Sequence, residues 1–240
     1  MTDLEKHVSR PGRDKIVKEV RNIGVNCNYY KVDISKSTHV KKMIPKIIKD
    51  FGGLNILVNN AGIVGAQNWW QRDIPNDADW HDVHEVNVRG MVRMSESVSQ
   101  HMKNRRYGKI INIASIAARQ GSPDLPHYSA TKAAVVSWTQ SNAIQLAPFN
   151  INVNAICPGL IWTPMWEAIA RKREKFGGPV SDARGISGRE IFERVVEQWI
   201  PMKREQRPSD IGNLAAFLAS DLSTNITGQS INVDGGRFMN

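Results

Sequence analysis

The sequence of 240 residues contains only two cysteines, Cys27 and Cys157, and no long apolar stretch. Its longest unbroken apolar runs, such as residues 133–136, fall far short of the roughly 18 to 20 residues that a transmembrane helix needs. Residues 1–6 mix acidic and basic side chains and lack the apolar segment of a secretory signal. We therefore expect a cytoplasmic protein with free thiols and no membrane span.

Aromatic residues do not alternate with the basic ones. The net charge of +9 is compatible with binding to phosphates, but surfaces that bind single-stranded nucleic acid interleave aromatic and basic side chains. We interpret the scattered basic clusters as solvated helix faces and expect no nucleic-acid partner. For the cluster formed by Arg171, Lys172, Arg173 and Lys175, contact with a phosphorylated or coenzyme A-linked substrate is the alternative.

No internal repeat, low-complexity tract or linker divides the chain, so we expect one domain over residues 1–240. Short runs rich in Val, Ile and Leu predict strands covered on both faces. Because helical patterns separate these runs, the sequence predicts an α/β fold with a doubly wound parallel sheet. The predicted strands are residues 28–34, 54–58, 109–114, 152–156 and 230–233, and the predicted helices are residues 37–51, 79–104, 126–147 and 209–220. Residues 162–200 mix helical pieces with glycine-rich turns and predict a lid over the sheet.

Tyr128 and Lys132 form the most informative pair of side chains. They lie four residues apart on a predicted helix and therefore on one face of it. We expect the lysine ammonium to lower the phenol pKa from its ordinary value of about 10. A tyrosine tuned in this way exchanges a proton with a carbinol or carbonyl oxygen. For such a pair on its own, a surface hydrogen bond is the alternative interpretation.

Three further polar features accompany this pair. Ser115 follows a predicted strand and precedes Tyr128 by thirteen residues, so its hydroxyl is expected at the carboxyl edge of the sheet, where it would hold a substrate oxygen. Residues 59–62, Asn-Asn-Ala-Gly, close the preceding strand and bring backbone close to any ligand at that edge. Asn87 lies inside a predicted helix, where an amide is unfavourable unless it has a specific role.

In this order and spacing, Asn-Asn-Ala-Gly, Asn87, Ser115, Tyr-x-x-x-Lys and the later Pro158-Gly159 resemble the short-chain dehydrogenase/reductase superfamily. The resemblance extends from about residue 25 to the end of the chain. It implies a Rossmann-type fold and an oxidoreductase that uses NAD, with NADP as the alternative. No metal is implied.

The resemblance also implies residue roles. Tyr128 would be the acid/base, Ser115 would hold the substrate oxygen, and Asn87 would position a water in a proton relay. Lys132 would lower the tyrosine pKa and bind the nicotinamide ribose. The positions that would contact the cofactor are Asp33, Ile34, Asn60, Ala61, Gly62, Tyr128, Lys132, Pro158, Gly159, Ile161 and Thr163.

The sequence lacks the glycine-rich turn with which this superfamily opens and which holds the cofactor pyrophosphate at a helix N-terminus. Before Asp33 the only glycines are Gly12 and Gly24. We expect that one N-terminal βα unit is missing, which would leave neighbouring strands without ladder partners and expose apolar faces. A start codon placed too far downstream is the favoured explanation, ahead of a genuinely shortened subunit and a gene fragment.

If residues 1–4 end the second strand of the fold, Asp3 would accept both ribose hydroxyls of the cofactor and favour NAD over NADP. An ordinary solvated aspartate is the equal alternative.

The substrate pocket is predicted from residues near the catalytic pair and on the lid. They are Ile116, Gln120, His127, Trp162, Met165 and Trp166, and the alternative is that the tryptophans only pack the lid onto the sheet. The lid and the C-terminal segment resemble polyol and vicinal-diol dehydrogenases, while neighbouring branches reduce 3-oxoacyl thioesters. A catalytically silent, cofactor-free subunit of an oligomer is the rival function. By analogy, we expect a homotetramer or homodimer.

Overall fold

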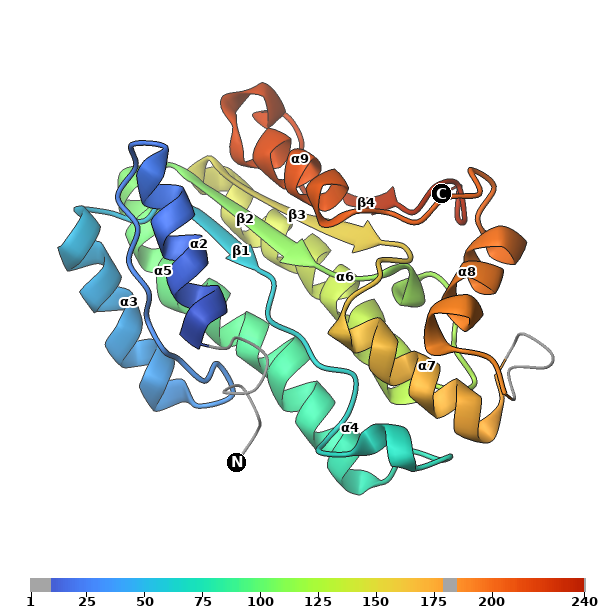
Figure 1. Cartoon of the computed structure of the whole chain (residues 1–240). Coiled ribbons are helices and arrows are strands. Elements are labelled where there is room, and N and C mark those ends of the chain that lie inside the picture. The colour runs from blue at the N-terminus through green and yellow to red at the C-terminus, as the bar shows by residue number, and fades with distance from the viewer. Residues whose placement is uncertain (1–9, 179–184, 240) are drawn as a thin grey trace.

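The computed structural model describes residues 10–178 and 185–239. Figure 1 shows a sheet whose strands all run in parallel. The strands lie in the order β1-β2-β3-β4, and they span Ile56–Asn59, Gly108–Ile113, Ile151–Pro158 and Ser230–Val233. Helices connect the strands, so the predicted doubly wound α/β fold is confirmed.

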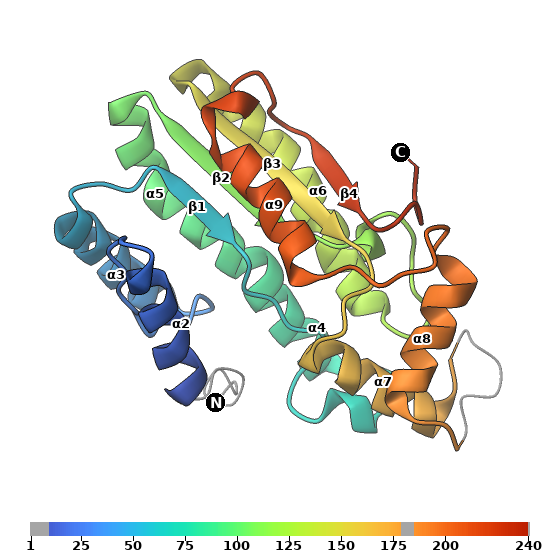
Figure 2. The ribbon, with the colours of Figure 1, turned by 45° about the horizontal axis from the view of Figure 1, so that its top comes forward.

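Helices cover both faces of this sheet (Figure 2). On one face, Ile110 of β2 packs with residues of α5 (Met91–Arg105) and α6 (Pro126–Leu146). On the other face, Ile111 packs with Leu218 of α9 (Pro208–Ala219). Because successive strand residues point to opposite faces and both faces are covered, the strands read as nearly continuous apolar runs.

The long helix predicted for residues 79–104 is divided in the structure. It begins as α4 (Asp77–His84), passes through a π-helix at Glu85–Gly90 and continues as α5. The side chain of Asn76 caps α4, accepting a hydrogen bond from the backbone N–H of Asp79. A π-helical turn widens the backbone spiral locally and is often found at functional sites.

The remaining helices include the two of the lid, and α2 is a helix that the sequence analysis did not predict. They are α2 (Arg10–Asn22), α3 (Ser37–Phe51), α7 (Pro164–Phe176) and α8 (Gly188–Trp199), with short 3₁₀ turns at Trp69–Gln71, Ile116–Ala118, Ala147–Phe149 and Asp221–Ser223. The helix over residues 37–51 has the bounds that its sequence predicts, and Gly52 ends it in the left-handed conformation at φ 74°.

The strand predicted for residues 28–34 is wrong within the described part of the chain. Val32 and Ile34 do pack against the core beneath α3 and α5, so the apolar pattern marks a buried face. A strand also needs a neighbouring ladder, and β1, the first strand of the sheet, pairs with β2 alone among the described strands. The apolar Ile56 and Val58 of β1 are 46% and 44% exposed.

Two predictions from the composition, on membrane spans and on the cysteines, can be compared with the described residues. Within residues 10–178 and 185–239, no helix is both long enough and apolar enough to cross a membrane. Cys27 and Cys157 are free thiols, and Cys157 is buried in the core beneath α6.

Candidate active site

A cleft of about 1030 Å³ lies beyond the carboxyl ends of the strands, between the sheet and the lid helices. This is the edge at which open parallel sheets bind ligands. The structure brings most of the predicted site residues to its wall. These are Asn60, Gly62, Ser115, Ile116, Gln120, Tyr128, Lys132, Pro158, Gly159, Ile161, Thr163, Met165 and Trp166.

Ser115 and Tyr128 meet at one wall of this cleft. Ser115 lies two residues after the end of β2 and caps the 3₁₀ turn at Ile116–Ala118, where its Oγ accepts a hydrogen bond of 3.1 Å from the backbone N–H of Ala117. Tyr128 lies in the first turn of α6 and shares a side-chain hydrogen bond with Ser115. The two hydroxyls therefore converge on the same point of the cleft.

The expected lowering of the Tyr128 pKa is wrong. Burial raises the pKa of the phenol to about 12, and the hydrogen bond with Ser115 only partly offsets this rise. The phenol is thus protonated at neutral pH. In this geometry, desolvation of the phenolate outweighs any attraction by the lysine four residues away.

Lys132 is 4% exposed and points toward the end of β2. Its Nζ donates a hydrogen bond of 2.8 Å to the backbone carbonyl of Ile113 and lies 5.6 Å from the centroid of the Tyr128 ring. Burial lowers the pKa of Lys132 to about 8. A methyl group added at Gly62 would lie 3.4 Å from this ammonium, so the bare glycine keeps the space beside it open.

Asn87 ties the π-helix to the loop after β1 and to α6. Its Oδ1 accepts a hydrogen bond of 2.9 Å from the N–H of Ile63, and its Nδ2 donates to the carbonyl of Ile63 and to Oγ1 of Thr131. Thr131 in turn donates to the carbonyl of Tyr128 at 2.8 Å. Thr131 was not predicted as a site residue, although its place between Tyr128 and Lys132 on the helix could have marked it.

Several predicted site residues do not line the cleft. The carboxylate of Asp33 accepts hydrogen bonds from the backbone and the hydroxyl of Ser35. Ile34 packs into the core against Gly90, and Ala61 also lies outside the cleft wall. Asp3 lies outside the described residues.

His127 and Trp162, contrary to the expectation of a substrate contact, are also placed away from the cleft wall. Because neighbouring helical residues point in different directions, the His127 ring turns away from Tyr128. It forms a hydrogen bond of 2.6 Å with the carbonyl of Val64. Trp162 packs edge-on against Phe192 inside the lid.

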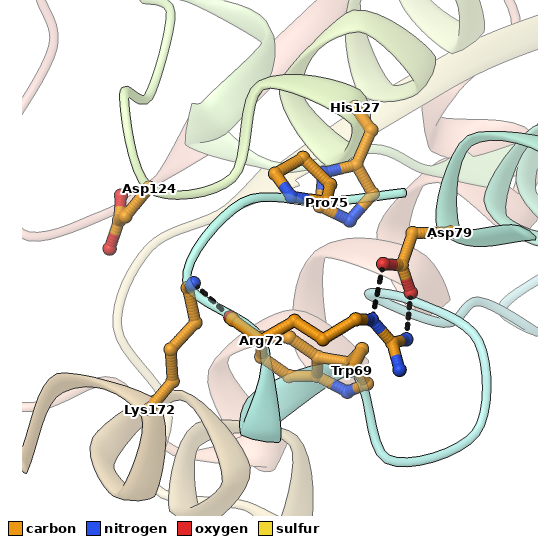
Figure 3. A pocket seen from close by; sticks show the side chains of 7 residues that line it. All are labelled: Trp69, Arg72, Pro75, Asp79, Asp124, His127 and Lys172. Carbon is orange, nitrogen blue, oxygen red and sulfur yellow. Dashed lines mark hydrogen bonds and ion pairs between the residues drawn. The ribbon is translucent and has the colours of Figure 1, made fainter. Parts of the chain in front are cut away.

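The lid is fixed to the rest of the molecule by buried charges (Figure 3). Lys172 of α7 is 4% exposed and donates hydrogen bonds to the carbonyls of Arg72 and Asp73. Arg72 in turn donates two hydrogen bonds to the carboxylate of Asp79, at 2.6 and 3.0 Å. The pocket enclosed by these groups has a volume of only about 10 Å³, which is close to the space of one water molecule, so it is no ligand site.

Arg173, the neighbour of Lys172, donates two hydrogen bonds to Asp124 in the loop before α6. The interpretation of residues 171–175 as a solvated helix face is therefore wrong for Lys172 and Arg173, which are both buried. Asp124 and Arg237 also line the cleft but were not predicted, and Arg173, named above only as an alternative substrate contact, lines it too. No local pattern marks them, because the three come from separate segments of the chain. Within the described residues, no group of His, Cys, Asp and Glu side chains could hold a metal ion.

Comparison with known proteins gives consistent relatives. A family model described as enoyl-(acyl carrier protein) reductase matches residues 6–237. The 3-oxoacyl-(acyl-carrier-protein) reductase FabG of Staphylococcus epidermidis is 35% identical over 231 residues, which cover 96% of this chain and 86% of the relative. A diacetyl reductase, (S)-acetoin forming, of Staphylococcus epidermidis is 36% identical over 220 residues, which cover 91% of this chain and 82% of the relative.

Solved structures share the fold. An NAD⁺-bound xylitol dehydrogenase superimposes with a TM-score of 0.85 at 30% identity, covering 95% of this chain and 86% of that structure. An actinorhodin polyketide ketoreductase variant with NADPH superimposes with a TM-score of 0.81 at 32% identity, covering 95% of this chain and 84% of that structure.

Proposed function

Because the chain belongs to the short-chain dehydrogenase/reductase superfamily, we propose that it transfers a hydride between a nicotinamide cofactor and a secondary alcohol or the corresponding ketone. The observation that carries this proposal is the convergence of Ser115, Tyr128 and Lys132 in one cleft at the carboxyl edge of the sheet. Tyr128 supplies a proton, Ser115 supplies a hydrogen bond to the substrate oxygen, and Lys132 supplies a stabilising cation.

The cleft fits the nicotinamide end of such a cofactor. Gly62 leaves open space beside the Lys132 ammonium, where the ribose hydroxyls would bind. Asn60, Pro158, Gly159, Ile161 and Thr163 line the same space. When bound, the cofactor supplies or accepts the hydride. We propose NAD as the cofactor and NADP as the alternative, since the xylitol dehydrogenase structure is bound to NAD⁺ and the ketoreductase structure contains NADPH.

The protein's own part is the proton chemistry. Tyr128, with a pKa of about 12, is a protonated phenol at neutral pH and donates its proton to a carbonyl oxygen held by the Ser115 hydroxyl. The ammonium of Lys132 stabilises the phenolate that remains. Asn87 positions the backbone of Ile63 and, through Thr131, the carbonyl of Tyr128, and we propose that it also orders a water for reprotonation.

The proposed substrate is a polyol, sugar alcohol or vicinal diol and its keto form. Gln120 gives the cleft a hydrogen-bonding group, and Ile116, Met165 and Trp166 give it an apolar wall. The diacetyl reductase and xylitol dehydrogenase relatives support this class. Reduction of a 3-oxoacyl thioester is the alternative, which the FabG relatives support. We propose a homotetramer or homodimer for the assembled enzyme.

The rival proposal is a cofactor-free subunit that serves an oligomer. Titration of the protein with NADH and NADPH, followed by cofactor fluorescence, separates the two functions, because only the enzyme binds either cofactor.

The mutation Tyr128→Phe tests the proposed function. Loss of the general acid should lower turnover of diacetyl, acetoin or a 3-oxoacyl thioester by about 100- to 10,000-fold while leaving the fold intact. Tyr107→Phe is the matched control, since Tyr107 lies outside the cleft and donates its hydroxyl hydrogen bond to Asp221. Turnover that is undiminished in Tyr128→Phe would contradict the assignment.

A further inference from the structure

Arg237 is a cation at the cleft wall without an acidic partner among the described residues. Its guanidinium is half-buried and lies over the rings of Trp199 at 4.9 Å and Phe238 at 5.2 Å. Within residues 10–178 and 185–239 it forms no ion pair and no hydrogen bond, so its N–H donors remain available in the cleft. Stacking on an aromatic face fixes a guanidinium plane without using its edge.

The backbone around Arg237 is held rigidly. The buried carboxylate of Asp234 accepts hydrogen bonds from the N–H groups of Gly236 and Phe238, at 3.0 and 2.8 Å, on both sides of Arg237. Gly235 and Gly236 take the left-handed conformation, with φ of 65° and 89°. A side chain at Gly235 would place its first carbon 2.6 Å from Ile200, so the turn depends on glycine. The arginine is thus presented to the cleft from a preorganised loop.

Each of the other charges of the cleft wall has a hydrogen-bonding partner, although the buried Nη1 of Arg173 is left without one. Arg173 is paired with Asp124 at 3.0 Å, and Asp82 lies 3.2 Å from the ring of His81. Lys132 donates to a carbonyl beside Tyr128 and belongs to the proton chemistry. Arg237 therefore supplies positive charge that nothing in the described structure neutralises.

Arg237 and Tyr128 both line the cleft, and one hydrophobic cluster connects their surroundings. Tyr128 and Trp199, on whose ring Arg237 lies, both pack against the hydrophobic cluster under the lid, which includes Phe192 and Ile200. A substrate whose carbonyl reaches Tyr128 can thus extend along this apolar cluster toward the guanidinium. The apolar surroundings strengthen a charge-assisted hydrogen bond formed there.

We propose that Arg237 is a specificity-determining residue that binds an anionic group of the substrate, a carboxylate or a phosphate. This inference rests on the proposed function and narrows its substrate class to acidic ketones and hydroxy compounds, such as keto acids, sugar acids or phosphorylated polyols. The fork of the guanidinium suits the paired oxygens of either group.

Matched acidic and neutral probes test the proposal. For the carboxylate arm, the probes are acetoacetate, levulinate and 5-oxohexanoate, each beside its methyl ester, and their increasing length covers the reach from Tyr128. For the phosphate arm, the probes are dihydroxyacetone phosphate and dihydroxyacetone. Binding to the full chain is measured by calorimetry and turnover by nicotinamide absorbance, in the wild type, Arg237→Gln, Arg237→Lys and Arg171→Gln. The last variant removes an exposed lid charge from outside the cleft wall.

The wild type should prefer at least one acidic probe over its neutral partner. Arg237→Gln should weaken binding of that acid by about 10- to 100-fold and leave the neutral partner within about twofold. Arg237→Lys should retain part of the preference, and Arg171→Gln all of it. The arm that shows the preference identifies carboxylate or phosphate.

Two results would overturn the proposal. The first is a wild type without preference for any acid, and the second is an Arg237→Gln variant that weakens acid and neutral probe equally, since an arginine that only supports Trp199 behaves in that way. Either result leaves the dependence of turnover on Tyr128 untouched. A failure of this inference is therefore distinguishable from a failure of the proposed function.

Discussion

The N-terminal region of the described chain and the region around β3 are built very differently. In α2 no described side chain is buried, and Ile23 just after it is 77% exposed. In β3, by contrast, seven of the eight residues are buried, between α6 on one face and α9 on the other. The candidate active site draws its side chains from the second region. The site geometry therefore depends on the buried β2-β3-α6 layer and on the lid that covers it.

Hydrogen exchange should give the largest contrast between the two regions. Amides in the middle of α6 are expected to exchange more than about a thousandfold more slowly than those in the last two turns of α2, because only local opening is needed to expose the latter. Exchange of intact protein followed by peptide mass measurement checks this ratio. Equal protection in the two helices would contradict the difference in packing between the two regions.

Removal of a side chain from the lid core should give the next largest effect. Phe192 is fully buried between Trp162 and Trp166, and Phe192→Ala should lower the free energy of unfolding by about 3 to 5 kcal/mol. Ile23→Ala in the exposed region should change it by no more than about 0.5 kcal/mol. Denaturant titration of both variants decides the matter, and similar losses would mean that the N-terminal region is packed as firmly as the lid.

The buried carboxylate that anchors the loop under the lid should matter somewhat less. Asp79 is 1% exposed, and Asp79→Asn leaves Arg72 without its charged partner, which should cost about 2 to 3 kcal/mol. The matched change in the exposed region is Asp50→Asn, which removes a carboxylate from a surface pair with Lys46 and should cost much less. Denaturant titration again measures both.

The pH dependence of stability sharpens this prediction. Burial alone raises the pKa of Asp79, but hydrogen bonds from Arg72, Asn76 and Ala66 outweigh it and hold that pKa below its ordinary value of 3.8. The stability that Asp79 contributes is therefore present above its ordinary pKa and is lost as the pH falls below it. Asp79→Asn should flatten the acid limb of the stability curve. An unchanged acid limb would show that other carboxylates cause it.

The smallest predicted effect is a change in the pH profile of turnover. Burial lowers the pKa of Lys132 to about 8, so its ammonium is present below that pH and lost above it. Since Tyr128 keeps its proton up to about 12, reductive kcat/KM should fall by about tenfold per pH unit above the lysine pKa. Lys132→Arg places a permanent charge at this position. The fall in kcat/KM of its residual activity should therefore move to higher pH. If the fall in kcat/KM stays at the same pH, the titration belongs to another group.

The parts of the fold that follow from local pattern were predictable from the sequence. Residues 230–233 and 37–51 form a strand and a helix with the predicted bounds, because apolar periodicity and a terminating glycine mark them. The failed strand at residues 28–34 shows the limit of this reasoning. Its alternating apolar side chains do pack, as Val32 and Ile34 show, but pairing depends on a neighbouring strand that no local pattern reveals.

The candidate site shows the same division. Ser115, Tyr128 and Lys132 could be placed in advance, because strand ends and helical spacing fix where such side chains lie. The pKa of Tyr128 could not, since it depends on burial by the surrounding structure. The burial of Arg173 and the place of Arg237 at the cleft could not be predicted either, because both guanidinium groups lie over Trp199 and so join segments far apart in the chain. The π-helix at Asn87 likewise has no signature in side-chain periodicity.

Deuterium transfer tests the central claim most directly. The wild-type protein is incubated with NADH or NADPH deuterated at the nicotinamide C4 position and with diacetyl, and the product is analysed by mass spectrometry. We predict one deuterium on the new carbinol carbon. Labelled product should no longer form with Tyr128→Phe but should still form with Tyr107→Phe. Binding of neither cofactor and no labelled product would contradict the assignment and favour a cofactor-free subunit.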